Sequence, residues 1–480
     1  MAKRIYFIGI GGISMSSLAA IAAAKGNKVC GSDMMEGESL KTLDNFNIPY
    51  FIGHKEENIK SFKPNLVVVT GAISEDNPEL VWAKQNKKKI LTRAEFLGNV
   101  SKEFKNVIAI SGTHGKTTTS ALISEIFIEA NLKPTVHVGG VLKRNGSSFL
   151  IGNKKYFITE ACEYKNSFLT LNPTVGVVLN IEPDHLDFFK NLTAIKHSFN
   201  CFLNNSKTKI FKNSDYDYIL KNEKTSAIYS AKNIKKTSIG YKFDFYENGL
   251  MKASIQTNFS GQHNVKNALV ACAVATYFKI KTSTIKKAIR HFSGVKRRFE
   301  KITRLENTIV IHDYAHHPTE ISKVISQAKM FGKVLTVFQP HTFSRTKKLF
   351  KEFLTAFDET DGLMLFKTYP AREEEDKSAS AKALYEKLLL KNPNFGQRQL
   401  SYFDQNEFKQ QNVQFNRTYE EIKFGQINQK YISYFETFDD AKNEVLKIYK
   451  NYDCILILGA GDIYELAYIL KRSKAEHQLS

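Results

Sequence analysis

The stretch Ser111-Gly112-Thr113-His114-Gly115-Lys116-Thr117-Thr118-Thr119 decides the fold of this chain. The apolar run at residues 107–110 directly before it predicts a buried strand, and the apolar spacing of residues 121–130 predicts a helix after it. A glycine-rich turn between a strand and a helix directs backbone N–H groups and the positive end of the helix at one point. The stretch therefore predicts a loop that binds a polyphosphate within an α/β fold.

Lys116 and Thr117 are the two side chains of this loop that a nucleotide would need most. Lys116 would reach the outer phosphates of ATP, and the Thr117 hydroxyl would be a ligand of Mg²⁺. The strict motif G-x-x-x-x-G-K-[ST] has a glycine where this chain has Ile110. A chance Gly-Lys-Thr in a basic chain is the alternative, and the flanking strand and helix argue against it. The predicted ATP-binding residues of the loop are Gly112, Thr113, His114, Gly115, Lys116, Thr117 and Thr118.

Composition and charge narrow the class of protein. The chain has 480 residues, of which 42% are hydrophobic and 12% aromatic, so we expect a globular protein of about three domains. The formal net charge of +21 suggests nucleic-acid binding, but the lysines are scattered and no basic block forms an arm. The composition thus favours attraction of anionic small molecules over binding of DNA or RNA.

The cysteines and the N-terminus indicate the compartment. The five cysteines are widely spaced without a C-x-x-C pair, which argues against a zinc knuckle or a disulfide framework and fits a reducing cytoplasm. Lys3 and Arg4 precede an apolar run that could imitate a signal peptide, but Gly9, Gly11 and Gly12 interrupt it. No run approaches the ~18 apolar residues of a membrane span. We predict a cytoplasmic protein without membrane insertion.

The N-terminal segment carries most of a nucleotide-binding fingerprint. Residues 4–8 predict a strand, Gly9-Ile10-Gly11-Gly12-Ile13-Ser14 a tight turn, and residues 15–25 a helix. Asp33 follows a second predicted strand about 20 residues on, where an acid meets a ribose in such folds. Ser14 occupies the third glycine position, so the match is partial, and a purely structural turn is the alternative.

Further strands separated by helical stretches predict an α/β architecture along the whole chain. These strands are at residues 66–69, 156–160, 175–180, 308–311, 334–338, 363–366 and 454–458. One stretch, residues 394–430, is rich in Gln, Asn and aromatics without clear periodicity. We interpret it as an insertion or a long loop.

Two strand ends after the phosphate loop carry candidate ligands for Mg²⁺. Glu160 opens Glu160-Ala161-Cys162-Glu163-Tyr164, and His185 closes Asn180-Ile181-Glu182-Pro183-Asp184-His185. Mg²⁺ takes oxygen ligands and keeps several waters, so one Thr hydroxyl and one carboxylate beside the phosphates suffice, and a histidine is a less usual ligand. Each residue could instead be a loop residue that caps a helix, but two such strand ends favour the metal site.

Two other segments offer contacts to a nucleotide. Asn264 opens a predicted helix, where its amide could hydrogen-bond the adenine edge or merely cap the helix. Arg298 lies at a junction between modules, where it could swing onto the γ-phosphate or remain a solvated linker charge.

Two polar segments, residues 313–320 and 338–346, follow strands of the third module, where ligands bind in doubly wound sheets. The adjacent His316 and His317 suggest zinc at first sight. Successive residues point in different directions, however, and no further ligand stands at zinc spacing. Hydrogen bonding to nucleotide or substrate is the favoured interpretation.

These motifs occur together in a specific order: Gly-Ile-Gly-Gly, Gly-Ser-Asp, Gly-Thr-His-Gly-Lys-Thr-Thr-Thr, Glu-Ala-x-Glu, Asn-Ile-Glu-Pro-Asp-His, His-Asn-x-x-Asn, Arg-Arg-Phe, Asp-Tyr-Ala-His-His-Pro-Thr-Glu and Gln-Pro-His-x-x-Ser-Arg-Thr. In this order they resemble the Mur ligases, most closely the branch that adds L-alanine. The resemblance runs from about residue 4 to Asp462 and weakens between 394 and 430. It implies three α/β domains, each a largely parallel sheet flanked by helices: 1–103 for the UDP substrate, 104–297 for ATP, and 298–480 for the amino acid and part of the ATP site.

The resemblance implies an ATP-dependent amide ligase of peptidoglycan synthesis that uses Mg²⁺, UDP-N-acetylmuramate and L-alanine. The lactyl carboxylate would attack the γ-phosphate to form an acyl phosphate, and the amine of L-alanine would displace phosphate. Lys116 and the loop N–H groups would offset the charge of the transferring phosphoryl group. A closing third domain would exclude water from the acyl phosphate. We expect a monomer or a weak homodimer.

The resemblance also implies roles for single residues, with Lys116, Thr117, Glu160 and His185 as the catalytic set. The remaining roles are Thr117, Glu160 and His185 around the metal; Asn264, Arg298 and Asp313 on ATP; Gly11, Gly12 and Asp33 on the UDP moiety; and His316, His341 and Arg345 near the substrates.

Four residues depart from the commonest pattern of the family. Ser14 and Ser17 replace glycines of the first loop, which leaves less room for the diphosphate. Cys162 stands where many relatives carry aspartate, and His312 replaces the first acid of an Asp-Asp-Tyr, which bears on ribose contacts. None of them coincides with the catalytic set, so we expect an active enzyme.

Three alternatives remain open from the sequence. A murein tripeptide ligase would share the phosphate loop but join a whole peptide to the same sugar nucleotide. A basic nucleic-acid-binding ATPase would be stimulated by DNA or RNA, and the lack of basic blocks counts against it. A NAD-binding oxidoreductase would rest on the partial first fingerprint and would leave the phosphate loop without a purpose.

Overall fold

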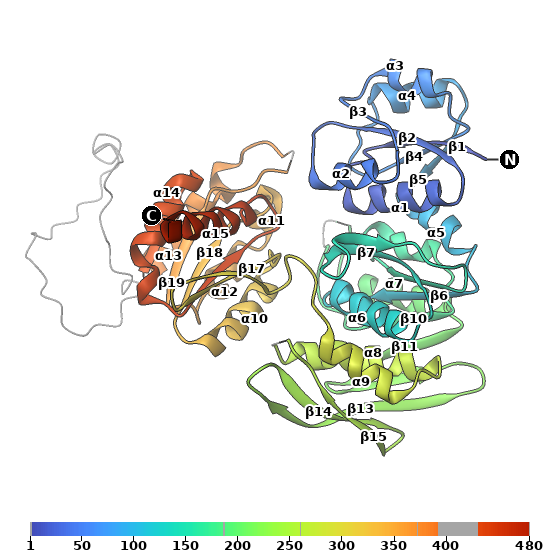
Figure 1. Ribbon diagram of the computed structural model, residues 1–480. Helices are drawn as coiled ribbons and strands as arrows, with labels where there is room; N and C mark the ends of the chain where they lie inside the picture. Colours follow the sequence, from blue (N-terminus) through green and yellow to red (C-terminus); the bar gives the residue numbers. More distant parts are fainter. Residues whose placement is uncertain (1, 186–187, 260, 372, 392–430, 480) are drawn as a thin grey trace, which may run out of the picture. The chain divides into compact units, whose positions relative to one another are not determined.

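The structure is a computed structural model that describes residues 2–185, 188–259, 261–371, 373–391 and 431–479. The segment 394–430, predicted to be an insertion or long loop, lies outside the described residues. The chain divides into two compact units, Met1–Lys296 and Arg297–Ser480 (Figure 1). The first unit holds two sheets and the second unit holds one.

The first sheet is parallel throughout and follows the order β3-β2-β1-β4-β5. Strands and helices alternate along the chain, as the glycine fingerprint predicts. Tyr6 packs with residues of α3 and α4, whereas its neighbours Ile5 and Phe7 pack with α1 and α5. The elements are β1 Arg4–Ile8, α1 Ile13–Ala24, β2 Lys28–Asp33, α2 Glu38–Asp44, β3 Tyr50–Ile52, α3 Glu56–Phe62, β4 Leu66–Val69, α4 Pro78–Gln85, β5 Lys89–Thr92 and α5 Arg93–Ser101.

The second sheet has ten strands in the order β15-β14-β13-β12-β11-β10-β6-β9-β7-β8. Strands β11, β10, β6, β9 and β7 run parallel, and antiparallel strands extend the sheet at both edges. Helices α6, α8 and α9 cover one face with a large apolar core. The elements are β6 Asn106–Ser111, α6 Lys116–Glu129, β7 Thr135–Leu142, β8 Ser147–Leu150, β9 Tyr156–Glu160, η1 Tyr164–Thr170, β10 Val175–Val178, α7 Leu192–Asn204, β11 Thr208–Ser214, β12 Asp217–Lys221, β13 Ser226–Lys236, β14 Tyr241–Glu247, β15 Leu250–Gln256, α8 His263–Tyr277 and α9 Thr282–His291.

The first and second sheets share one hydrophobic core. Phe7 of β1 and Phe96 of α5 belong to it, and their rings meet edge to face with centroids 5.4 Å apart. Phe104 and Phe157 of the second sheet belong to the same core and stack with centroids 4.8 Å apart. Because close-packed cores resist deformation, the turn after β1 and the loop after β6 are held on one scaffold.

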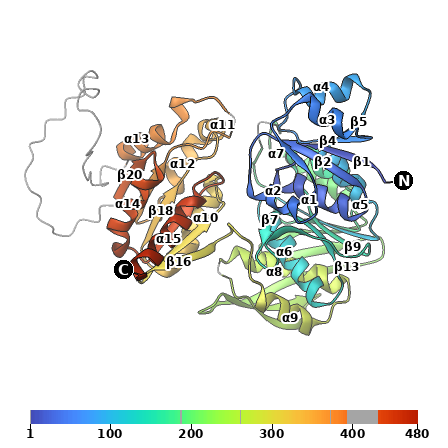
Figure 2. The ribbon, with the colours of Figure 1, turned by 45° about the horizontal axis from the view of Figure 1, so that its top comes forward.

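The third sheet follows the order β16-β17-β21-β18-β19-β20, with β16 antiparallel to β17 and the other neighbouring pairs parallel. Ile309 and Ile311 pack with α10, α12 and α13, whereas Val310 packs with α14 and α15. Figure 2 shows these helices around the third sheet. The elements are β16 Glu300–Leu305, β17 Thr308–Asp313, α10 Pro318–Ala328, η2 Lys329–Phe331, β18 Val334–Phe338, α11 Phe343–Lys348, α12 Phe350–Ala356, β19 Gly362–Phe366, η3 Lys377–Ala379, α13 Ala381–Lys391, β20 Tyr431–Phe435, α14 Phe438–Ile448, η5 Tyr449–Asn451, β21 Cys454–Leu458 and α15 Tyr464–Leu479.

The α/β class predicted from the sequence is confirmed. The strands predicted at 66–69, 156–160, 334–338 and 454–458 have the same bounds as β4, β9, β18 and β21. The antiparallel strands β12 to β15 were not predicted from the sequence. Buried and exposed positions are mixed along these strands, and many of the exposed ones are lysine, so the strands lack the continuous apolar runs that mark buried parallel strands.

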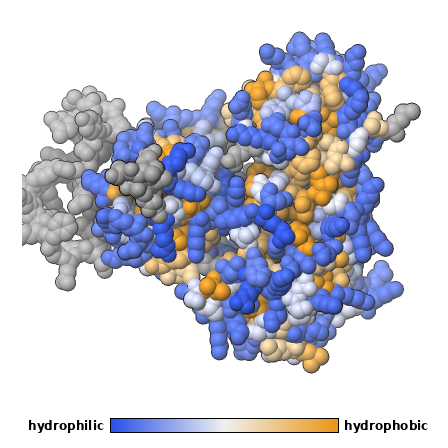
Figure 3. Space-filling model, in the orientation of Figure 1, coloured by the Kyte–Doolittle hydropathy of each residue, from blue (hydrophilic) through white to orange (hydrophobic). Residues whose placement is uncertain are grey.

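The surface agrees with the scattered lysines of the sequence. The face drawn in Figure 3 is mainly hydrophilic, with apolar residues in smaller patches. In the part of the chain that the structure describes, no helix combines the length and the apolar character needed to cross a membrane. The five cysteines all lie in described segments and are free thiols there.

Candidate active site

Residues 112–115 connect β6 to α6 and form the predicted phosphate loop. Gly112 has a φ of 139° and Gly115 a φ of 87°, which residues with a side chain rarely adopt. A Cβ on Gly115 would lie 2.6 Å from Oδ1 of Asn267, and a Cβ on Gly112 would lie 2.9 Å from Cβ of Leu179. The course of the loop therefore depends on both glycines.

Asn180, which follows β10, holds the middle of this loop. Its Oδ1 accepts a hydrogen bond from the N–H of His114 at 2.9 Å, and its Nδ2 donates to the carbonyl of His114 at 3.0 Å. The N–H of Thr113 donates to the carbonyl of Asn180 at 3.2 Å. Asn180 had no predicted role, although its place at the end of the predicted strand 175–180 was the available signal.

Lys116 begins α6 and is surrounded by acceptors. Its Nζ lies 3.0 Å from both carboxylate oxygens of Glu163, and it donates to the carbonyls of Gly112 at 2.5 Å and Thr113 at 3.1 Å. The Glu163 side chain is 3% exposed and that of Lys116 is 18% exposed. Burial is the largest single influence and lowers the pKa of the Lys116 ammonium, but the charge and hydrogen bond of Glu163 together with the charges of Cys162 and Glu160 hold the net pKa above its ordinary value. Lys116 is thus a firmly charged donor at the loop.

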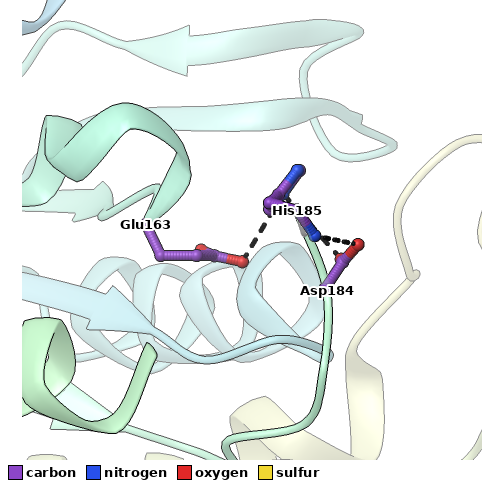
Figure 4. A group of neighbouring side chains, drawn as sticks. All are labelled: Glu163, Asp184 and His185. Atoms are coloured by element: carbon purple, nitrogen blue, oxygen red, sulfur yellow. Dashed lines mark hydrogen bonds and ion pairs between the residues drawn. The ribbon is translucent and has the colours of Figure 1, made fainter. Parts of the chain in front are cut away.

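Glu163, Asp184 and His185 form a group that could hold a metal ion (Figure 4). Each offers one ligand atom, and these atoms lie within 4.8 Å of one another. Nε2 of His185 is 3.8 Å from Oε1 of Glu163 and 3.8 Å from Oδ2 of Asp184. Because two of the three ligands are carboxylates, the set suits a hard cation such as Mg²⁺.

Of the predicted metal ligands, the structure brings His185 next to Glu163, a residue to which the sequence analysis gave no role. Glu163 lies three residues beyond the end of β9, between that strand and η1. The second acid of Glu-Ala-Cys-Glu was the only signal for it, and the spacing alone does not tell which acid faces the loop. Burial raises the pKa of the neighbouring Cys162 thiol, which keeps that thiol protonated.

The other two predicted metal ligands, Thr117 and Glu160, both lie beside Gly139 and Gly140 of β7. Oε1 of Glu160 accepts a hydrogen bond from the N–H of Gly139 at 2.6 Å. A Cβ on Gly140 would lie 2.8 Å from Cγ2 of Thr117. The two glycines let β7 pass close to both side chains, with Glu160 beside Gly139 and Thr117 beside Gly140.

Asn264 is joined to the phosphate loop through a second amide. It is the second residue of α8 and is 9% exposed. Its Oδ1 accepts a hydrogen bond from Nδ2 of Asn267 at 2.9 Å, and Asn267 in turn lies against Gly115. The predicted contact of Asn264 with adenine stays a prediction. Asn267 was missed, although it is the last residue of His-Asn-x-x-Asn.

The turn after β1 brings together the three residues predicted to hold the UDP moiety. The N–H of Gly11 donates to Oδ2 of Asp33 at 2.8 Å, and Gly12 is the N-cap of α1. A Cβ on Gly11 would lie 2.9 Å from the same carboxylate oxygen. Asp33 therefore fixes the turn, and its contact with a ribose stays a prediction.

Ser14 and Ser17, which replace glycines of the family pattern, bind groups of the second sheet. Oγ of Ser14 lies 2.9 Å from Nε2 of His137 on β7, and Oγ of Ser17 lies 2.7 Å from Oγ of Ser148 on β8. Both contacts add polar links to the shared apolar core. The predicted crowding of the diphosphate by these serines stays a prediction.

In the second unit, Asp313 ends β17 and organises the chain around it. Its Oδ2 accepts a hydrogen bond from the N–H of Phe299 at 2.6 Å, and its Oδ1 accepts one from the N–H of Ala315 at 2.7 Å. Burial raises the pKa of Asp313 to about 6, although Arg298 and the two N–H groups act in the opposite direction. The guanidinium of Arg298 lies 5.3 Å from the ring centroid of Tyr314. The structure thus places the predicted ATP contacts Arg298 and Asp313 at one strand end.

His316, His341 and Arg345 lie near each other in the same unit. The ring centroids of His316 and His341 are 6.0 Å apart, and Nη1 of Arg345 donates to the carbonyl of His341 at 3.0 Å. Burial lowers the pKa of His316, and burial together with Arg345 lowers that of His341 to about 4. Both imidazoles are therefore neutral near pH 7, and each can accept or donate a hydrogen bond.

The histidine pair does not form a metal group among the described residues. Nδ1 of His316 lies 3.0 Å from the carbonyl of Tyr314, and His317 caps α10 by accepting from the N–H of Thr319. His312 is buried near the ring of Tyr464, and burial and then Arg297 lower its pKa to about 3.

The chain belongs to the Mur ligase family. Three family models match it in order along the sequence: the Mur ligase family catalytic domain over residues 4–105, the Mur ligase middle domain over residues 110–275, and the Mur ligase glutamate ligase domain over residues 297–461. The resemblance stated from the motifs is thereby confirmed.

Two relatives and one solved structure show which branch of the family the chain is similar to. The UDP-N-acetylmuramate–L-alanine ligase of Clostridium tetani is 40% identical, with 96% of each chain covered. The enzyme of the same name from Caldicellulosiruptor bescii is 41% identical, with 98% of this chain and 99% of the relative covered. The crystal structure of the UDP-N-acetylmuramate–alanine ligase of Thermotoga maritima superposes with a TM-score of 0.77 at 25% identity and covers 99% of this chain and 100% of that chain.

His137 gives a pH-dependent stability that can be measured. Burial, aided by the charge of Arg93, lowers the pKa of its imidazole from 6.5 to about 4. The unfolded chain therefore binds a proton here at a higher pH than the folded chain. This contribution is fully present above pH 6.5, and about 3 kcal/mol of it is lost as the pH falls to about 4. We expect NMR titration to show a neutral His137 ring at pH 5.

The matched variant is His137→Gln, whose free energy of unfolding should fall less between pH 7 and pH 4.5 than that of the wild type. A His137 ring that titrates near pH 6.5 in the folded protein would contradict this expectation.

Proposed function

We propose that the chain joins L-alanine to the lactyl carboxylate of UDP-N-acetylmuramate, with conversion of ATP to ADP and phosphate, in peptidoglycan precursor synthesis. The observation that carries the proposal is the phosphate loop, with its buried Lys116–Glu163 pair, in a chain about 40% identical to ligases of that name. The predicted cytoplasmic location and the monomeric or weakly dimeric state remain part of the proposal.

The reaction has two balanced steps. A carboxylate oxygen of the sugar acid attacks the γ-phosphorus of ATP, the bond to the β–γ bridging oxygen breaks, and ADP leaves. The amine of L-alanine then attacks the carbonyl carbon of the acyl phosphate, and the tetrahedral intermediate expels phosphate and forms the amide. The proton lost by the amine leaves with phosphate or solvent. Both steps place negative charge where fixed donors lower its energy.

Lys116 supplies the mobile positive charge of this mechanism. Its partners in the structure are the Glu163 carboxylate and two loop carbonyls, all within 3.1 Å. A triphosphate on the loop offers more negative charge at the same place, so Lys116 can exchange these acceptors for phosphate oxygens. The N–H groups at the start of α6 add a fixed dipole to the same site.

The residues near the loop fit Mg²⁺. Glu163, Asp184 and His185 form one group of ligand atoms, and Thr117 and Glu160 lie beside Gly140 and Gly139 of β7. Glu163, Asp184 and His185 would hold Mg²⁺, which would offset negative charge on the phosphates. A Lys116 side chain that turned to the phosphates would leave the Glu163 carboxylate free to hold the cation.

Phosphate release with different acceptors tests the function directly. With ATP, Mg²⁺ and UDP-N-acetylmuramate, we expect L-alanine to give rapid phosphate release and a product whose mass increases by one alanyl residue. The Ala-containing tripeptide of the murein tripeptide ligase reaction is the control acceptor and should give little. Faster turnover with the tripeptide, or no turnover with any acceptor, would contradict the proposal.

Lys116→Ala should lower kcat by at least ~10³-fold, because it removes the charge that stabilises the transferring phosphoryl group. Loss of Lys116 also leaves Glu163 buried without its partner, so the double variant Lys116→Ala/Glu163→Gln controls for unfolding. Lys84→Ala, which removes a surface lysine of α4 paired with Glu75, should leave kcat unchanged. If kcat of Lys116→Ala stays within a few fold of the wild-type value, the loop lysine does not stabilise the transferring phosphoryl group and the proposed mechanism is wrong.

Magnesium titration tests the two candidate carboxylates. Glu163→Gln and Glu160→Gln should each raise the Mg²⁺ concentration for half-maximal activity by about 10-fold, since each removes a charge near the cation. Glu56→Gln, in an exposed i,i+4 pair with Lys60, is the matched control and should not shift the curve. If one of the two variants leaves the titration unchanged, that carboxylate has no place at the metal.

A further inference from the structure

Arg93 is a cation near the first turn without an ion-pair partner among the described residues. It is the first residue of α5 and is half-buried. Its Nη1 donates to Oγ of Ser14 at 3.2 Å, and no carboxylate among the described residues lies within ion-pair distance of it. A guanidinium has five N–H donors, so most of its capacity is unused by those residues. Holding such a charge half-buried without an anion is unfavourable unless a ligand supplies one.

A one-way chain of hydrogen bonds holds Ser14 in place for Arg93. Because Oγ of Ser14 accepts from Arg93, its own proton points to Nε2 of His137, 2.9 Å away. Nδ1 of His137 then donates to the hydroxyl of Thr159 at 3.0 Å, and that hydroxyl donates to the carbonyl of Glu160 at 3.1 Å. This assignment of protons requires a neutral ring, which agrees with the lowered pKa of His137.

The hydrogen bond to Ser14 places Arg93 beside the first turn. Ser14 is the second residue of α1, directly behind the turn that contains Gly11 and Gly12. Arg93, which bonds to Oγ of Ser14, is therefore a cation beside the turn that is predicted to hold the UDP moiety.

We propose that Arg93 binds the diphosphate of the UDP-linked substrate, with its side chain oriented by Ser14 and His137. This inference rests on the proposed function, which requires a UDP-linked acid in the first unit. A guanidinium binds phosphate oxygens through two parallel N–H donors, which lysine cannot do. The N-terminus of α1 directs further N–H groups toward the same anion. The diphosphate is favoured over the lactyl carboxylate because Arg93 bonds to Ser14 at the first turn.

The same contact explains a departure from the family pattern. Glycine in place of Ser14 would offer no hydroxyl to Arg93 or His137. In this chain the Ser14 hydroxyl therefore holds the guanidinium of Arg93 in place. The space that the serine side chain takes from the diphosphate is offset by a positioned positive charge.

Calorimetry with UDP and with UDP-N-acetylmuramate tests the assignment. We expect Arg93→Ala to weaken both ligands by about 10- to 100-fold, because a charge-assisted contact to each diphosphate is lost. Arg93→Lys should lie between the wild type and Arg93→Ala, and an ATP analogue should bind all variants equally. Arg144→Ala is the matched control and should bind UDP like the wild type. Arg144 lies between β7 and β8 and forms an ion pair with Glu125 of α6.

Any other outcome contradicts the assignment of Arg93 to the diphosphate, and the outcomes differ in what they imply. Equal UDP affinity of Arg93→Ala and wild type removes Arg93 from the diphosphate. A loss confined to UDP-N-acetylmuramate, with UDP binding intact, places Arg93 on the carboxylate instead. If Arg93→Ala fails to fold, Arg93→Lys decides, and an unchanged UDP affinity there contradicts bidentate binding. If the wild type binds neither UDP nor UDP-N-acetylmuramate, the proposed function is wrong, and the inference about Arg93 is then wrong as well.

Discussion

The contact between Lys116 and Glu163 is the interaction on which the account of the site depends. Glu163 is almost fully buried, and a buried carboxylate is tolerated only with a partner of opposite charge. Lys116 provides that charge from the first residue of α6, where the glycines of the loop bring the backbone close to Leu179 and Asn267. The site therefore keeps a cation beside the loop together with the carboxylate that we propose as a metal ligand.

The rest of the first unit positions this pair. Strands β6, β9 and β10 run parallel, so their carboxyl ends deliver the phosphate loop, the Glu160–Glu163 segment and the Asn180–His185 segment to one edge. The apolar core shared with the first sheet fixes the Gly11–Gly12 turn on the same scaffold. The network from Arg93 through Ser14 and His137 to Thr159 adds a polar link across that boundary. In the second unit, Arg298 and Asp313 share one strand end, and His316, His341 and Arg345 lie near each other.

Much of the fold followed from the sequence because apolar runs mark buried parallel strands, as at β4, β9, β18 and β21. The loop from Gly112 to Lys116 was also predictable, since glycine spacing, a preceding strand and a following helix coincide. The antiparallel strands β12 to β15 were not predictable in this way, because buried and exposed positions are mixed along them and no continuous apolar run marks them. Glu163 and Arg93 could not be predicted from the sequence for another reason. Glu163 lies in the irregular segment between β9 and η1, and Arg93 begins α5, far along the chain from its partner Ser14. Their partners depend on tertiary packing, which local spacing does not encode.

A crystal structure with a non-hydrolysable ATP analogue and Mg²⁺ tests the central claim most directly. The account predicts phosphates along residues 112–117, with Nζ of Lys116 moved from Glu163 to a phosphate oxygen and the Glu163 carboxylate turned to the cation. A nucleotide bound elsewhere, with Lys116 still 3.0 Å from Glu163, would contradict it.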